Sequence, residues 1–234
     1  MTKGSAPGPA PHDAAVAGPA AYLAKGGTYF QGMRADYVEA LPADPGATLL
    51  EIGCSEGQTG ALALARGKCA RYIGIELHDP SARIAATRLS EVHVGNIEEM
   101  ALDVLPPGGL DAILLSEVLE HLVDPWKVVA RLVPLLRPGG LMFASSPNIC
   151  HHRVIRSLIA GQWTLANEGV MDRTHLRWFT PASYAAMFAG AGLKVEEIRP
   201  VRPFGWKPRL INRLTGNRWS HLFMTQTSIR ARKP

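Results

Sequence analysis

Short apolar runs recur along the chain, separated by longer stretches in which apolar and polar residues mix. The first run is A-T-L-L-E-I-G (47–53), which ends in a glycine-rich turn. A short continuous apolar run bounded by turn residues is typical of a buried β-strand. We expect seven strands, at 47–53, 71–77, 91–96, 110–116, 141–146, 193–198 and 223–231.

Capping and breaking residues set the helices expected between these strands. Segments 57–67 and 81–89 have helical patterns. Asp124 followed by Pro125 supplies an N-cap and a first-turn proline for a third helix. Pro134 lies within that helical pattern, so we expect a kink or an early stop there.

The order of strands and helices predicts an α/β fold. We expect a Rossmann-like, doubly wound, mostly parallel seven-stranded sheet with helices on both faces and an N-terminal helical cap over 18–40. R-P-G-G (137–140) predicts a turn before the fifth strand. Residues 1–20 are rich in Gly, Pro and Ala and indicate a flexible lead-in, so 21–234 is expected to form a single domain. Segment 147–181 is longer than a crossover needs and predicts a lid or wall over a ligand site.

The composition excludes several classes of protein. It is that of a globular protein, with 47% hydrophobic and 19% charged residues. No apolar run approaches the roughly 20 residues of a membrane helix, and the N-terminus lacks the pattern of a signal peptide. Three cysteines without a C-x-x-C pair argue against a disulfide framework or a structural zinc. We expect a cytoplasmic protein that is a monomer or a homodimer.

The net charge of +5 is concentrated near one end. From Lys194 to Pro234 there are ten Lys or Arg and two Glu, so the rest of the chain is slightly acidic. A basic segment of this kind attracts nucleic acid, anionic lipid headgroups or a phosphorylated substrate, or it is a solvated face without a partner.

The turn after the first strand has the pattern E-x-G-x-S-x-G, formed by Glu51, Gly53, Ser55 and Gly57. Glycines there allow positive φ and let a ligand approach the backbone. A dinucleotide site instead has G-x-G-x-x-G and admits a pyrophosphate at the helix N-terminus. The acid two residues before the first glycine would repel a pyrophosphate, whereas it could face a cationic amine directly or through a water.

More polar residues end the next strands, and the carboxyl ends of parallel strands meet at one edge of a sheet. Glu76 ends the second strand and is placed to accept both hydroxyls of a ribose. Asn96 can accept a hydrogen bond from an exocyclic amine, and Ile97 offers a backbone N–H and an apolar wall. S-E-V-L-E-H-L (116–122) follows the fourth strand. Together these residues predict a site for an adenosine.

In this order and spacing the motifs resemble the class I S-adenosylmethionine-dependent methyltransferases. The resemblance runs from about Tyr29 and rests on L-L-E-I-G-C-S-E-G, I-G-I-E, G-N-I-E, S-E-V-L-E-H-L-x-D-P, L-x-P-G-G and S-S-P-N. D-R-T-H-L-R-W-F-T-P (172–181) followed by A-G-L-K-V is similar to the small-molecule branch, which includes ubiquinone-pathway O-methyltransferases and sugar, glycan and natural-product methyltransferases. It implies S-adenosyl-L-methionine as cofactor and methyl transfer to an oxygen, or less readily a nitrogen, of a small molecule.

The resemblance also implies which residues hold the cofactor. The loop after the first strand, with the end of the fourth, would line the methionine part, and Glu76 would hold the ribose. Asn96 and Ile97 would frame the adenine, and Tyr29 could close over the site. The expected cofactor-binding residues are therefore Tyr29, Glu51, Gly53, Ser55, Gly57, Glu76, Asn96, Ile97, Ser116 and Glu117.

Two positions depart from the family pattern. Ser55 stands where the middle glycine of the loop is usual, and Asn96 stands where an acid is usual. Serine is small, and asparagine keeps an acceptor while losing the charge. We expect somewhat weaker cofactor binding at most.

An oxygen acceptor often needs a base, for which the sequence offers several histidines. The first candidate is His175, with Asp172 as its orienting partner, and the second is His121. For His121 a structural role in the loop after the fourth strand is the stronger interpretation, and for His175 the two roles weigh equally. His151 and His152 could join Asp172 at a divalent metal, but adjacent histidines more often lie at the surface, and we expect no metal.

Other functions stay open. An NAD-dependent oxidoreductase is one, although the loop spacing and Glu51 argue against it. A non-enzymatic module that binds the cofactor or a partner is another. Nucleic acid is not expected as the acceptor, because no N-P-P-Y-like tetrad follows the fourth strand. Segment 147–181 together with the basic segment 199–218 indicates an anionic small-molecule acceptor, and the basic segment would also suit peripheral contact with a membrane.

Overall fold

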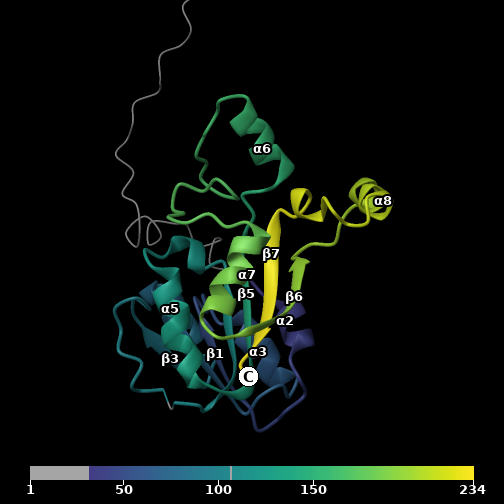
Figure 1. The fold of residues 1–234 in the computed structure, drawn as a ribbon. Coiled ribbons are helices and arrows are strands. Elements are labelled where there is room, and N and C mark those ends of the chain that lie inside the picture. Colours follow the sequence, from purple (N-terminus) through teal and green to yellow (C-terminus); the bar gives the residue numbers. More distant parts are fainter. Residues whose placement is uncertain (1–31, 106) are drawn as a thin grey trace, which may run out of the picture.

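The computed structural model describes residues 32–105 and 107–234 and is built on one seven-stranded sheet (Figure 1). The strand order is β3-β2-β1-β4-β5-β7-β6, in which the first five strands run parallel and β7 runs antiparallel to both of its neighbours. The predicted α/β fold with a mostly parallel sheet is confirmed. The strands are β1 (Thr48–Ile52), β2 (Arg71–Glu76), β3 (Glu91–Val94), β4 (Leu110–Ser116), β5 (Leu136–Pro147), β6 (Lys194–Pro200) and β7 (Gln226–Arg232).

Helices cover both faces of the sheet. Their bounds are α2 (Ala35–Ala40), α3 (Gln58–Ala65), α4 (Asp79–Ala85), α5 (Pro125–Leu132), α6 (His152–Ile159), α7 (Pro181–Gly190) and α8 (Trp206–Leu214). Side chains of α5 and α7 belong to one buried cluster, whereas those of α2, α3 and α4 belong to a second. Because side chains alternate along a strand, Leu50 and Ile52 of β1 enter the first cluster and Leu49 enters the second.

The helix boundaries follow the breaking residues. Asp124 caps α5 by accepting a hydrogen bond from the main-chain N–H of Lys127. The helix ends at Leu132, and Pro134 lies in a 3-10 turn (Val133–Leu135), so the predicted early stop is confirmed. The expected lead-in and much of the expected N-terminal helical cap lie outside the described residues, and α2 is the part of the cap that the structure describes.

The turn predicted at 137–140 is wrong, because these residues stay in β5 as a bulge. Leu110 pairs with Leu136 but Ala112 pairs with Leu141, so β5 holds extra residues between two points of the ladder. Gly139 has a φ of 77°, and a Cβ at Gly140 would lie 2.9 Å from the Arg137 carbonyl oxygen. The two glycines thus let the strand bend without leaving the sheet.

Two helices project beyond the carboxyl ends of the parallel strands, namely α6 after β5 and α8 between β6 and β7 (Figure 1). The segment that carries α6 returns to the sheet through a bridge between Asn148 and Phe179. Among the described residues, no helix has the length and apolar character needed to cross a membrane.

A helical glycine controls how closely α3 packs on β2. A Cβ on Gly60 would lie 2.4 Å from Cδ2 of Leu89 and 2.5 Å from Cδ1 of Tyr72. We expect Gly60→Ala to lower the free energy of unfolding by about 1–3 kcal/mol through overpacking, measured as a lower urea midpoint at an unchanged m-value. Gly190→Ala in α7 is the matched control, because a Cβ there meets nothing within 4 Å. Equal stability of the two variants would contradict this account of the packing.

Candidate functional site

The turn between β1 and α3 holds three alternate residues in the left-handed conformation. Gly53, Ser55 and Gly57 have φ values of 69°, 52° and 80°. A Cβ at Gly53 would lie 2.7 Å from Cγ2 of Val118, so the loop after β4 closes tightly against this turn. Ser55 occupies a conformation that favours glycine, at a cost of about 1–2 kcal/mol.

Glu76 ties this turn to the end of β2. One carboxylate oxygen accepts the main-chain N–H of Ser55 and the other accepts that of His78, both at 2.8 Å. The side chain is 1% exposed, and burial raises its pKa above the usual range. The carboxylate has four lone pairs, more than its main-chain partners use, so Glu76 can still accept a hydrogen bond from a ligand.

A cavity opens at the carboxyl ends of β1, β2 and β4, beside the loop that follows β3. Its walls bring together five of the expected cofactor-binding residues and one expected catalytic residue. Apolar side chains, among them Ile52, Ile75, Val118 and Leu122, form much of the rest of its lining. The expected residues that line it are Gly53, Glu76, Asn96, Ile97, Glu117 and His121.

Asn96 holds its own loop. Its side-chain oxygen accepts the main-chain N–H of Glu98 at 3.0 Å, and its amide donates to the Glu99 carboxylate at 3.1 Å. The neighbouring Ile97 is buried. The pair therefore presents one polar and one apolar side chain to the same wall of the cavity.

Glu51 lies away from the cavity, on the opposite face of β1. It is 3% exposed and accepts a hydrogen bond of 2.9 Å from the Tyr72 hydroxyl. Burial raises the pKa of Glu51 to about 7. The alternation of side chains explains this position, because Ile52 is on the cavity side and Glu51 must face the other way. Tyr29 lies outside the described residues.

Arg34 was missed by the sequence reasoning and joins the ends of β4 and β5. Its Nη1 donates to the hydroxyls of Ser116 at 2.7 Å and Ser145 at 2.6 Å. Its Nε and Nη2 donate to Asp36 at 2.8 and 2.9 Å, and the guanidinium stacks on the Tyr37 ring. No local pattern announces this residue, because its serine partners are 82 and 111 positions away along the chain.

Glu117 lies next to this cluster, at the edge of the cavity. It has a φ of 54° and accepts hydrogen bonds from the Ser145 hydroxyl at 2.7 Å and from the Gln226 amide at 2.8 Å. Burial raises its pKa, against the opposing effect of the Arg34 charge. Arg34, Ser116, Ser145 and Glu117 thus form a connected polar group at the ends of two neighbouring strands.

His121 and His175 meet although they are far apart in sequence. Their ring centroids are 4.8 Å apart, nearly edge to face. The main-chain N–H groups of Leu176 and Arg177 donate to the Glu120 carbonyl, which holds the two segments together. Nδ1 of His121 lies 3.3 Å from the Thr174 carbonyl, whereas Nδ1 of His175 has its own carbonyl partner. The pair brings His175 beside the cavity that His121 lines.

Asp172 holds the turn that carries His175. Its carboxylate accepts the main-chain N–H and the hydroxyl of Thr174 at 2.8 and 2.7 Å, and its carbonyl accepts the main-chain N–H of His175. The residue is 2% exposed. Asp172 thus fixes the backbone of this turn, and its role in orienting the His175 ring stays a prediction.

One group near the cavity could hold a divalent cation. Within the described ranges, one group of three potential metal ligands has donor atoms that all lie within 4.8 Å of one another. It consists of Glu120, His121 and His175. Burial, and next the charge of Glu117, raise the pKa of Glu120 well above its usual range. His151 and His152 form no such group with Asp172 in these ranges. Nδ1 of His152 lies 3.0 Å from the Leu222 carbonyl oxygen.

The sheet order and the cavity at the carboxyl ends of its strands define the fold of the class I methyltransferases. The chain belongs to the methyltransferase domain family, whose model matches residues 27–198. It is an S-adenosylmethionine-dependent methyltransferase.

The relatives agree with this assignment, and the solved structures share the fold. A ubiquinone biosynthesis O-methyltransferase from Cupriavidus pinatubonensis is 28% identical over 171 residues, covering 71% of this chain and 68% of the relative. Another, from Xanthomonas campestris pv. campestris, is 26% identical over 183 residues, covering 76% and 75%. Among solved structures, an S-adenosylmethionine-dependent methyltransferase from Archaeoglobus fulgidus has a TM-score of 0.61 at 21% identity, covering 88% of this chain and 96% of that one. The [4+2]-cyclase SpnF shares the fold, with a TM-score of 0.58 at 20% identity, covering 85% and 80%.

The buried Glu51 predicts a stability that depends on pH. Its pKa of about 7 exceeds the ordinary value of 4.5, so the folded protein binds this proton more tightly than the unfolded chain. Stability should fall as pH rises between about 4.5 and 7, by about 3 kcal/mol for this group. Glu51→Gln keeps an acceptor for Tyr72 but cannot ionise. The stability of this variant should therefore fall less between pH 4.5 and 7 than that of the wild type. Urea denaturation of both proteins from pH 4.5 to 7.5 measures the difference, and parallel curves would contradict the prediction.

Proposed function

We propose that the protein transfers the methyl group of S-adenosylmethionine to an oxygen of a small molecule. The observation that carries the proposal is one cavity lined at one side by Glu76, Asn96 and Ile97 and at the other by Glu117 and His121. The names of the O-methyltransferase relatives support oxygen as the acceptor atom. The NAD-dependent alternative is dropped, because the chain belongs to a methyltransferase family.

The residues that line the cavity suit an adenosine in their chemistry. Glu76 accepts the ribose hydroxyls with the lone pairs that Ser55 and His78 leave open. Ile97 and the other apolar side chains of the wall contact the faces of the adenine, and Asn96 accepts from its amine. Gly53 lines the same cavity, where its main chain meets the chain that links the ribose to the methionine part.

The methionine end lies toward β4 and β5. Arg34 uses four hydrogen bonds to hold its guanidinium beside Ser116 and Ser145, and its remaining N–H binds the cofactor carboxylate. Glu117 faces the cationic amine. Glu51 acts from the far side of β1 by fixing that strand through Tyr72.

The cofactor supplies an activated methyl group on a positively charged sulfur. The protein aligns an acceptor oxygen with that methyl group and removes the acceptor's proton. His175 takes the proton, with His121 packed against its ring. Segment 147–181, fixed to the sheet at Asn148 and Phe179, forms the wall of the acceptor site.

The charge of the acceptor stays a prediction. The arginines expected to attract an anion are Arg209, Arg213 and Arg218, and none of them lines the cavity. Arg199 is held by Asp36 at 3.3 Å. An anionic acceptor would therefore have to meet these cations outside the cavity.

Two variants and two ligands separate the halves of the cofactor site. S-Adenosylhomocysteine contains the adenosine and the amino acid, whereas 5′-methylthioadenosine lacks the amino acid. We expect Glu76→Gln to weaken both ligands, and Arg34→Gln to weaken only S-adenosylhomocysteine, each by about tenfold or more in calorimetry. Each variant is the control for the other. If Arg34→Gln weakened both ligands equally, the assignment of the carboxylate to Arg34 would be wrong.

The reaction is tested by incubating the protein with methyl-labelled cofactor and a metabolite extract, followed by mass spectrometry. A product heavier by one labelled methyl group supports the proposal and identifies the acceptor. Cofactor binding without any labelled product would favour the non-enzymatic module.

The role of His175 is tested with the acceptor so found. We expect His175→Ala to lower kcat about 100-fold or more while the affinity for S-adenosylhomocysteine changes little. Equal losses in kcat and in affinity would make His175 structural. Loss of wild-type activity on chelation, restored by a divalent cation, would assign Glu120, His121 and His175 to a metal instead of a base.

A further inference from the structure

The helix α8 exposes its apolar side chains and buries a polar one, the reverse of the other elements of the domain. Its large apolar side chains are exposed, with Trp206 at 71%, Leu210 at 52% and Leu214 at 77%. A spacing of four residues places these three on one face of the helix. The buried residue of α8 is polar, since Asn212 is 3% exposed. A helix that only packed on its own domain would show the opposite arrangement.

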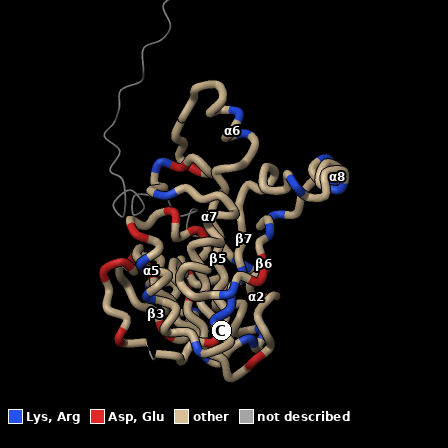
Figure 2. The backbone as a smooth tube through the Cα atoms, in the orientation of Figure 1, with Lys and Arg blue, Asp and Glu red and all other residues tan. Residues whose placement is uncertain are grey.

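Cations flank this apolar face. At 100° per residue, Arg209 and Arg213 lie on one side of the stripe and Lys207 lies on the other. No Asp or Glu occurs from residue 198 to residue 234. Figure 2 shows Lys and Arg on α8 without an acidic residue on the helix. Among the described residues, the ion pairs include none of these three cations, so no carboxylate neutralises their charge. The Lys207 ammonium lies 5.4 Å from the centroid of the Trp206 ring.

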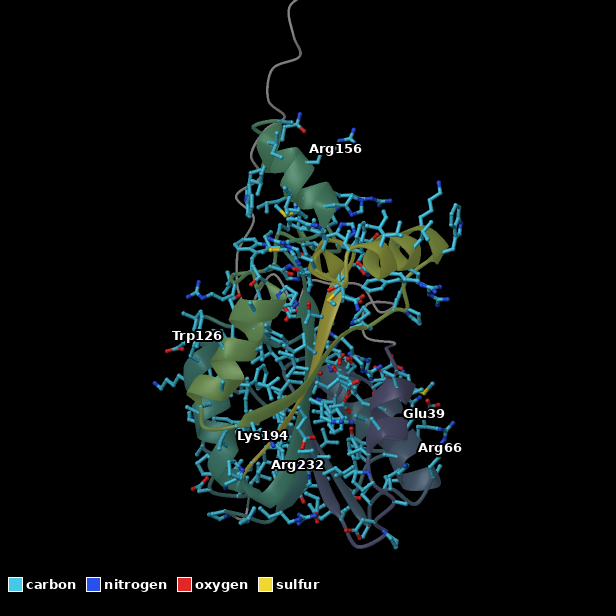
Figure 3. All side chains as sticks on the ribbon, turned by 45° about the vertical axis from the view of Figure 1, so that its right-hand side comes forward. Glu39, Arg66, Trp126, Arg156, Lys194 and Arg232 are labelled. Carbon is cyan, nitrogen blue, oxygen red and sulfur yellow. The ribbon has the colours of Figure 1, made fainter. Side chains whose placement is uncertain are left out.

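The helix also stands clear of the sheet. It lies between β6 and β7, at the carboxyl ends of the parallel strands, and its side chains extend into the surroundings in Figure 3. Trp219, which follows α8, is 45% exposed as well. The position leaves the apolar stripe open to a flat surface.

We propose that α8 docks on an anionic lipid surface. Trp206, Leu210 and Leu214 enter the boundary between headgroups and acyl chains, and the flanking cations meet lipid phosphates. An apolar groove on a protein would explain the stripe, but it would not need the cations on both sides or the lack of acids in this part of the chain. Tryptophan is favoured at such interfaces because its ring is apolar and its N–H is polar. The proposal is independent of the methyl acceptor.

The test is co-sedimentation of the full chain with vesicles of phosphatidylcholine alone or mixed with phosphatidylglycerol. We expect binding to the anionic vesicles, weakened by high salt, and little binding to the neutral ones. A variant with Trp206→Ser, Leu210→Ser and Leu214→Ser should bind the anionic vesicles at least about tenfold less tightly. A variant with Lys207→Gln, Arg209→Gln and Arg213→Gln should lose about fivefold per cation, since each contributes about 1 kcal/mol.

The matched control replaces exposed apolar residues elsewhere, Ile84→Ser with Val104→Ser, and should bind like the wild type. Unchanged S-adenosylhomocysteine affinity shows that each variant is folded. Quenching of tryptophan fluorescence by brominated lipid, reduced in Trp206→Phe, would place the stripe in the bilayer.

Three results would overturn the proposal. The first is no binding of the wild type to anionic vesicles. The second is equal binding by the wild type and the triple serine variant. The third is a concentration-dependent dimer in light scattering that the serine variant abolishes without any vesicle binding, which would assign the face to a second copy of the chain.

Discussion

The hydrogen bond from the Ser55 N–H to the Glu76 carboxylate determines the shape of the whole site. It holds the turn after β1 against the end of β2 and keeps three alternate residues left-handed. The strain at Ser55 is offset by this charge-assisted bond, which a carboxylate in water would not make as strongly. This turn also fixes where α3 starts and how closely Val118 approaches Gly53. One buried acid therefore serves both the fold and the cavity.

A second constraint acts on the other side of the cavity. Arg34 brings its charge to Ser116 and Ser145, and Ser145 passes the connection on to Glu117. A guanidinium that is largely removed from water is costly unless its N–H groups are hydrogen-bonded, so the side chains of this cluster can adopt few arrangements. The chain before β1 is thus linked to the ends of β4 and β5 by polar contacts rather than by packing alone.

Sequence periodicity sufficed for the sheet and for the turn at 53–57, because buried parallel strands and positive-φ turns have strong local patterns. The same periodicity also predicts that Glu51 faces away from the cavity, since it alternates with the apolar Leu50 and Ile52. The role of Arg34 and the contact of His121 with His175 could not be predicted from the sequence, because the partners of these residues are set by tertiary structure. The turn predicted at R-P-G-G was wrong for another reason. Glycine and proline indicate a bend in the chain, but they do not indicate whether strand pairing continues across it.

The position of β7 has a consequence for how the chain is made. β7 lies between β5 and β6, so it fills a gap inside the sheet rather than extending an edge. On the ribosome, β6 emerges before β7, the strand with which it pairs. It cannot join the sheet through this pairing until Gln226–Arg232 have been synthesised. Non-local pairing of this kind is slow and leaves strand edges exposed to other chains. Nascent protein that stalls between Pro200 and Gln226 therefore leaves the β7-facing edges of both β5 and β6 unpaired.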